Sequence, residues 1–118
     1  LIDIGLIIPG GTDAPVEIGD PRIEFYAAVT RKDVDGFYDK GWNLHQRVTR
    51  EEALKMFTIW PAIASFQEDV KGTIEKGKLA DLTVFNKNLM TIPEHEILES
   101  KNILTIVGGQ EVFSSIDR

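Results

Sequence analysis

The 118-residue sequence contains no cysteine. This absence excludes a disulfide framework and every metal site that is built on thiolates. Lys and Arg number 13 against 19 Asp and Glu, which gives a formal net charge of −6 without any basic run. Because binding to phosphates needs clustered Lys and Arg, we expect no nucleic-acid partner. No stretch approaches the roughly 18 consecutive apolar residues of a membrane span, so we expect no membrane partner either.

The first residues, Leu1 to Gly5, lack a methionine and a basic segment. They therefore do not form a signal peptide, and we expect the protein in the cytoplasm. The missing methionine fits a piece of a longer chain and a natural domain with a trimmed terminus equally well. Apolar residues make up 42% of the chain, enough for a packed core and too many for global disorder.

The first two-thirds of the sequence mix apolar runs with loop signals. Residues 2–8 form a short apolar run that predicts a strand, and Gly10 to Pro21 predict a loop. A helix is expected to begin at Pro21 with Asp20 as its N-cap. Residues 32–48 carry aromatic side chains among Gly and Asp without a clear period, and this pattern predicts a long surface loop.

The clearest helix signal begins at Thr49. Thr49 as N-cap and Glu52 three residues later form a capping box, in which each side chain satisfies a free backbone N–H. Pro61 lacks an N–H and clashes one turn back, so it cannot lie inside a straight helix. The sequence therefore predicts one helix that ends near Ile59 and a second, short helix that begins at Pro61.

The last third is rich in strand signals. Leu82 to Phe85 predict a strand after an "EKGK" turn, and Asp81 is expected to form a structural hydrogen bond at its start. In "NILTIVGGQEVFSS" the two central residues are Gly108 and Gly109. They supply the two positive φ angles of a type I′ turn, so this stretch predicts a hairpin.

Asp13 is the leading candidate for a functional side chain. It follows the apolar residues 6–8 and two glycines, Gly10 and Gly11. A carboxylate at the end of a strand is where α/β barrel enzymes place catalytic groups, so Asp13 is a candidate metal ligand or general base. From spacing alone the alternative is favoured, namely that Asp13 fixes the loop through an Asx turn or a helix cap.

The other candidates are more ambiguous. His45 and His95 are fifty residues apart and do not have the spacing of metal ligands; His45 could reach a substrate, and His95 is expected on a surface helix. Phe37, Tyr38 and Trp42 fit the lining of an apolar pocket and the anchoring of a long loop equally well.

Several segments, taken in order, resemble a known family. They are "GGTDAPVE", "DP", "YAAVTR", "LHQRVTREEALKMFT", "GTIEKGKLADLTVFNKNLM" and "GG" with "VF" shortly after. Together they resemble the C-terminal end of the amidohydrolase superfamily, most closely the branch called amidohydrolase family 3. The resemblance covers nearly the whole chain, and its most specific parts are "GTDAPV" and "GKLADLTVF".

The resemblance implies an α/β fold divided between two domains. Residues 1–68 would form the C-terminal end of a (β/α)8 TIM barrel, with residues 2–9 as its last strand and 50–66 as closing helices. Residues 69–118 would supply the C-terminal strands of a composite β-sandwich built from both ends of the chain. This arrangement makes the chain a fragment of a longer protein.

The resemblance also implies a reaction. In the family, an aspartate at the position of Asp13 binds a divalent metal, for which zinc is the expectation, and takes the proton from the attacking water. The metal activates that water and polarises the substrate carbonyl of a small molecule, so that an amide, a cyclic amide or a related C–N bond is hydrolysed. The remaining metal ligands of the family, among them a His-x-His pair, are absent from these 118 residues. A catalytic zinc needs about three protein ligands, so we expect the isolated chain to be inactive and to bind no metal.

Two functional hypotheses remain from the sequence. The first is a fragment of a metal-dependent amidohydrolase. The second is a non-catalytic binding or regulatory domain derived from the same family. We also expect self-association, or association with the missing N-terminal part, because a strand cut out of a barrel exposes an unpaired apolar edge.

Overall fold

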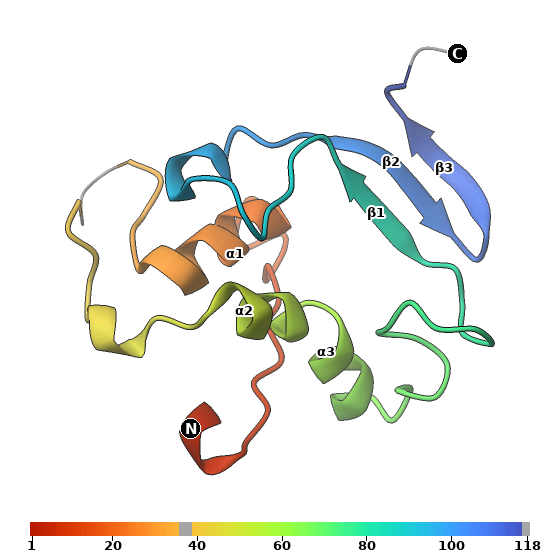
Figure 1. Ribbon diagram of the computed structural model, residues 1–118, viewed down its shortest axis with the longest axis horizontal. Helices are drawn as coiled ribbons and strands as arrows, with labels where there is room; N and C mark the ends of the chain where they lie inside the picture. Colours follow the sequence, from red (N-terminus) through yellow and green to blue (C-terminus); the bar gives the residue numbers. More distant parts are fainter. Residues whose placement is uncertain (36–38, 117–118) are drawn as a thin grey trace.

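The computed structural model describes residues 1–35 and 39–116 (Figure 1). Within these ranges the helices are α1 (Pro21–Thr30), α2 (Arg50–Met56) and α3 (Ile59–Ala64), with short 3-10 helices η1 (Ile2–Ile4), η2 (Leu44–Gln46) and η3 (Glu94–Glu96). The strands are β1 (Leu82–Phe85), β2 (Asn102–Val107) and β3 (Gln110–Ser114). The predicted α/β class is confirmed at this level: helices precede a three-stranded antiparallel sheet.

Helix α1 begins where the sequence predicts. Asp20 has extended backbone, and its side chain accepts the N–H of Arg22, while Pro21 occupies the first helical position. Proline suits this place because its missing N–H would have no partner within the helix. The helix ends at Arg31, whose φ of 57° lies in the left-handed region and whose N–H donates to the carbonyl of Ala27.

Helices α2 and α3 are separated by the break that Pro61 predicts, although the boundaries differ. The capping box is present, because the Thr49 hydroxyl accepts the Glu52 N–H and the Glu52 carboxylate accepts the Thr49 N–H. Helix α2 ends at Met56 rather than near Ile59, and α3 begins at Ile59 rather than at Pro61. Pro61 is thus the third residue of α3, in the first turn, where a missing N–H is tolerated.

One hydrophobic core joins three separate segments. Phe25 and Val29 of α1, Ala53 of α2 and Ile97 just after η3 are buried together. Ile97 and Ala53 are completely inaccessible to solvent. Burying an isoleucine side chain contributes about 1.5–3 kcal/mol, so Ile97 fixes the segment around η3 against the two helices.

Two arginines strengthen the same connection by hydrogen bonding. The guanidinium of Arg22, in α1, donates to the carbonyl of Ser100. The guanidinium of Arg50, at the start of α2, donates to the carbonyl of Leu89. Residues 89–100 are therefore attached at both ends to the helices, and they lead directly into β2.

The sheet has the order β1-β2-β3, with both pairs antiparallel. Leu82 lies opposite Ile106 and Val84 opposite Leu104, so these four apolar side chains share one face. Val107 pairs with Gln110 around Gly108 and Gly109, whose φ angles are 58° and 81°. The predicted hairpin is therefore confirmed. Figure 1 shows the sheet beside the helices rather than stacked on them.

The predicted strand over residues 2–8 is wrong. Ile2–Ile4 form the 3-10 helix η1, and residues 6–13 have no regular secondary structure. A strand needs backbone partners, and the described residues provide no ladder for this segment. Several apolar side chains at this end of the chain are therefore exposed to solvent: Leu1 is 74% exposed, Ile4 75% and Leu6 51%.

The helices were also compared with the length and hydropathy of a membrane span. None of those in the described parts of the chain is long and apolar enough to cross a bilayer.

The capping box provides a test of the helical part. Replacing Thr49 by Ala removes the hydroxyl that accepts the Glu52 N–H, so we expect the free energy of unfolding to fall by about 1 kcal/mol. Thr49→Ser keeps the hydroxyl and should stay close to the original value. Chemical denaturation followed by circular dichroism measures both variants, and equal losses in the two would contradict the assigned role of the hydroxyl.

Candidate functional site

Asp13 lies in the irregular segment that follows the apolar residues 6–8. Its φ of 50° is in the left-handed region, which Asp tolerates better than most residues. Its backbone carbonyl accepts the N–H groups of Val16, at 2.9 Å, and Glu17, at 3.3 Å. The loop is thus closed by the main chain of Asp13.

The carboxylate of Asp13 is exposed, and the structure records no hydrogen bond to it from the described residues. The Asx-turn and capping alternatives both need this carboxylate as an acceptor. The local structure therefore does not use the Asp13 side chain to hold the loop, which leaves both oxygens available to another group.

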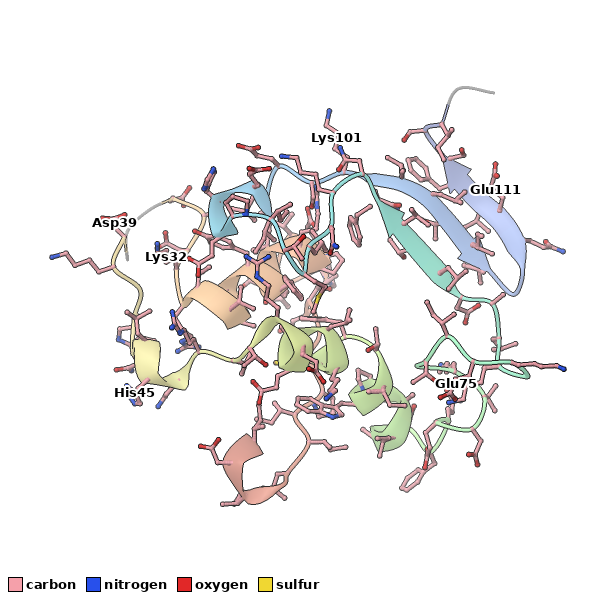
Figure 2. All side chains as sticks on the ribbon, in the orientation of Figure 1. Lys32, Asp39, His45, Glu75, Lys101 and Glu111 are labelled. Carbon is pink, nitrogen blue, oxygen red and sulfur yellow. The ribbon has the colours of Figure 1, made fainter. Side chains whose placement is uncertain are left out.

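The other candidate side chains do not gather around Asp13. Figure 2 shows His45 at the periphery, on η2, with its ring directed away from the body of the molecule. His95 is exposed on the 3-10 helix η3. Within residues 1–35 and 39–116, no group of three or more His, Asp or Glu side chains is placed to hold a metal ion. The described part of the chain therefore does not form a metal site by itself.

Trp42 has a structural partner. The guanidinium of Arg31 lies over the indole ring, 5.3 Å from its centre, and the Arg31 Nε donates to the Trp42 carbonyl at 3.2 Å. The Trp42 N–H donates in return to the Arg31 carbonyl at 2.8 Å. For Trp42 the structure favours the loop-anchoring alternative, whereas Phe37 and Tyr38 lie outside the described residues.

Asp81 has the structural role that the sequence predicts. Its Oδ1 accepts the N–H of Gly108 at 2.7 Å. This bond joins the start of β1 to the turn between β2 and β3, so Asp81 stabilises the hairpin.

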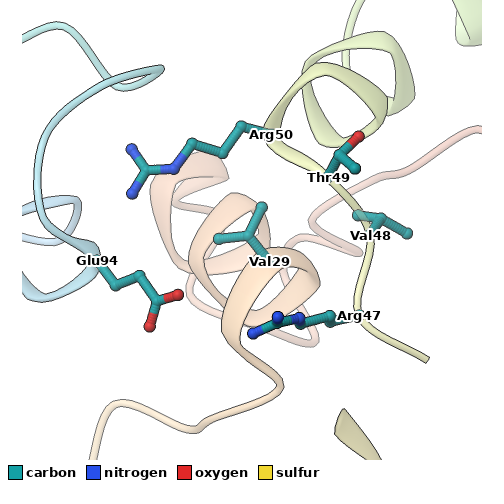
Figure 3. Close-up of a pocket in the computed structure, with 6 residues that line it drawn as sticks. All are labelled: Val29, Arg47, Val48, Thr49, Arg50 and Glu94. Carbon is teal, nitrogen blue, oxygen red and sulfur yellow. The ribbon is translucent and has the colours of Figure 1, made fainter. Parts of the chain in front are cut away.

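A cavity that the sequence does not reveal lies between α1 and the start of α2 (Figure 3). Its volume is about 300 Å³, and it combines an apolar floor with charges of both signs. Its lining residues are Val29, Arg47, Val48, Thr49, Arg50 and Glu94. Since they come from three distant segments, no local motif could have indicated them. The Thr49 hydroxyl and the Arg50 guanidinium are already engaged within the chain, so this cavity is a weaker candidate than Asp13.

A charged pair lies at the other end of α1. Arg22 Nε donates to Asp20 Oδ1 at 2.9 Å, and the two side chains are about a quarter exposed. The hydrogen bond from the Arg22 side chain lowers the pKa of Asp20 below its ordinary value of 3.8, against an opposing effect of burial. Both residues line a second cavity, of about 570 Å³, between residues 18–22 and the β1–β2 part of the sheet.

Comparison with known proteins identifies the class. Residues 1–113 match the amidohydrolase family, and the chain belongs to this family. The predicted resemblance is therefore confirmed.

Individual relatives extend this result. YtcJ of Bacillus subtilis strain 168, a candidate amidohydrolase, is 32% identical over 96% of this chain. The N-substituted formamide deformylase of Arthrobacter pascens is 31% identical over 92% of it, and the Arabidopsis thaliana protein LONG AFTER FAR-RED 3 is 27% identical over 96%. The matches cover 21%, 20% and 19% of these relatives, so the chain spans about a fifth of their length.

A solved structure shows the same similarity. The amidohydrolase from Thermotoga maritima MSB8 superposes with a TM-score of 0.69 at 27% sequence identity. The match covers 97% of this chain and 24% of that protein.

The Asp20–Arg22 pair predicts a dependence of stability on pH. The pKa of Asp20 is lower in the folded chain than its ordinary 3.8. The ionised carboxylate therefore stabilises the folded chain fully above about pH 4, and this stabilisation is lost as the pH falls through the pKa of the folded state. Asp20→Asn keeps an N-cap acceptor but removes the charge. We expect this variant to lose less of its unfolding free energy than the original chain between about pH 5 and pH 3. Denaturant titrations across this range measure the difference, and parallel pH profiles would count against the pair.

Proposed function

We propose that this chain is the C-terminal part of a metal-dependent amidohydrolase, in which Asp13 is both a metal ligand and the general base. The observation that carries the proposal is the exposed, unengaged carboxylate of Asp13 within a chain whose residues 1–113 match the family. The relatives are about five times longer than this chain. Their length supports a site that is completed by residues outside these 118.

The proposed architecture follows from the same resemblance. Residues 1–68 would be the C-terminal end of a TIM-barrel domain, and residues 69–118 would belong to a composite β-sandwich. The rest of the protein would supply backbone partners for residues 7–9, for which the described part of the chain records none. The partly exposed apolar face formed by Leu82, Val84, Leu104 and Ile106 supports packing against another sheet.

The metal itself needs ligands that this chain lacks. A carboxylate is a suitable ligand for zinc, and Asp13 would be the one contributed from here. When bound, the divalent ion would lower the pKa of water and polarise the substrate carbonyl. With a single ligand the isolated chain should be inactive.

Asp13 would carry the proton through the reaction. Its carboxylate accepts a proton from the attacking water as the new C–O bond forms at the carbonyl carbon. The C–N bond then breaks, and the same proton passes from Asp13 to the leaving nitrogen. The substrate class is a small molecule with an amide, a cyclic amide or a related C–N bond, and the relative named as a deformylase of N-substituted formamides supports this class. The cytoplasm stays the expected location.

Replacing Asp13 tests this function in the full-length protein. We expect Asp13→Ala to lower the metal content, measured by inductively coupled plasma mass spectrometry, and to reduce hydrolysis of C–N substrates by at least about a hundredfold. Asp3→Ala removes another exposed carboxylate of the same segment and should change neither. A full-length protein without metal under any condition would instead favour the alternative, a binding or regulatory domain.

The exposed apolar segment predicts association of the isolated chain. Val16 and Ile18 are 77% and 81% exposed, and Ile4 of η1 is exposed as well. We expect size-exclusion chromatography with light scattering to give a mass above the 13.2 kDa of one chain. Ile4→Asp with Ile18→Asp should weaken the association, whereas Ile74→Asp, on the exposed loop before β1, should not. A stable monomer at high concentration would contradict the prediction.

A further inference from the structure

Among the described residues, Gly10 makes the backbone hydrogen bond recorded between the segment that carries Asp13 and the helices. The N–H of Gly10 donates to the carbonyl of Met56 at 2.8 Å. Before Gly10 the other backbone bonds recorded for this segment are local, within residues 1–6, and after it they close the turn at Asp13. Gly10 is therefore the residue that holds this segment against the end of α2, three residues before Asp13.

The acceptor is available because α2 ends at Met56. In a continuous helix the Met56 carbonyl would accept the N–H of Trp60, four residues further on. Pro61 prevents this continuation, since its ring would clash with the carbonyl of Phe57. The last carbonyls of a helix need partners from elsewhere, and Gly10 supplies one of them.

The space at position 10 favours glycine, and the backbone angle there does not demand it. A Cβ there would lie 3.1 Å from Cε1 and Cζ of Phe57 and 3.4 Å from Cβ of Met56. The Phe57 ring is half-buried and packs against the buried cluster around Ala53, so a methyl group at position 10 would press the ring toward that cluster. Gly11 differs, because a Cβ added to it meets no atom of the described residues within 4 Å.

We propose that Gly10, seated on the Phe57 ring and bonded to the Met56 carbonyl, is the positioning residue for Asp13. The inference rests on the proposed function of Asp13. Three extended residues span at most about 10 Å, so a displacement of Gly10 is transmitted to the carboxylate over a short distance. A displacement of about 1 Å at a reacting group can cost about a hundredfold in rate.

The test compares two neighbouring glycines in the full-length protein. We expect Gly10→Ala to lower kcat by about ten- to a hundredfold with KM unchanged. Gly11→Ala adds the same methyl group where it contacts none of the described residues, and it should stay within about twofold of the original kcat. Combining Gly10→Ala with Phe57→Leu makes room for the methyl group and should restore at least part of the lost kcat.

A second readout does not depend on activity. In thermal unfolding, the change in Tm caused by Gly10→Ala should be smaller when Phe57 is already Leu, whereas the change caused by Gly11→Ala should not depend on residue 57. If Gly10→Ala fails to fold, Phe57→Leu alone replaces it, with an expected several-fold loss of kcat at unchanged KM.

The outcomes separate the two proposals. If the full-length protein hydrolyses its substrate with a dependence on Asp13, but Gly10→Ala matches Gly11→Ala or Phe57→Leu gives no recovery, the positioning role is overturned. An unchanged kcat in Phe57→Leu alone, where that variant is used, overturns it too. If the full-length protein is inert and Asp13→Ala changes nothing, the proposed function itself is wrong, and the coupling in Tm still shows whether Gly10 rests on Phe57.

Discussion

The end of helix α2 at Met56 is the constraint on which much of the structure depends. Pro61 lacks a backbone N–H and would clash with the carbonyl of Phe57, so the helix cannot run on into α3. The break leaves the Met56 carbonyl free for the N–H of Gly10, and the Phe57 ring beside it lies next to both Gly10 and the core. The break near Pro61 thus provides the carbonyl to which the segment of Asp13 is bonded.

The N-terminal end of α2 is also held by specific contacts, and the contacts at its two ends position α2 relative to its neighbours. The capping box sets the first turn, and Arg50 within this turn holds the carbonyl of Leu89. Ala53, in the middle, lies in the core with Ile97. Helix α2 is only seven residues long, and a helix of this length is not stable alone in water. Its stability therefore comes from the contacts that also hold the segment before β2.

The family and the exposed surface give a consistent account of what this chain lacks. The relatives are about five times longer, and most of the large apolar side chains in the first 18 residues of this chain are exposed. Apolar surface of this kind is removed from water when it packs against another part of a protein. In the proposed function, the metal ligands that would join Asp13 and the residues that would cover this surface both come from outside these 118 residues.

Local signals in the sequence determined the elements whose structure depends on neighbours in the chain. The Asp20 cap, the Thr49–Glu52 box and the Gly108–Gly109 turn each depend on backbone chemistry within a few residues, and each is present. Pro61 correctly indicated two helices, although the break lies between Met56 and Ile59. The ordered motifs also identified the family. Only the tertiary structure decided that Gly10 rests on Phe57, that Ile97 joins the core and that Arg31 covers Trp42. It also decided that residues 2–8 form no strand, because a strand is made by partners distant in sequence, and an apolar run cannot supply them itself.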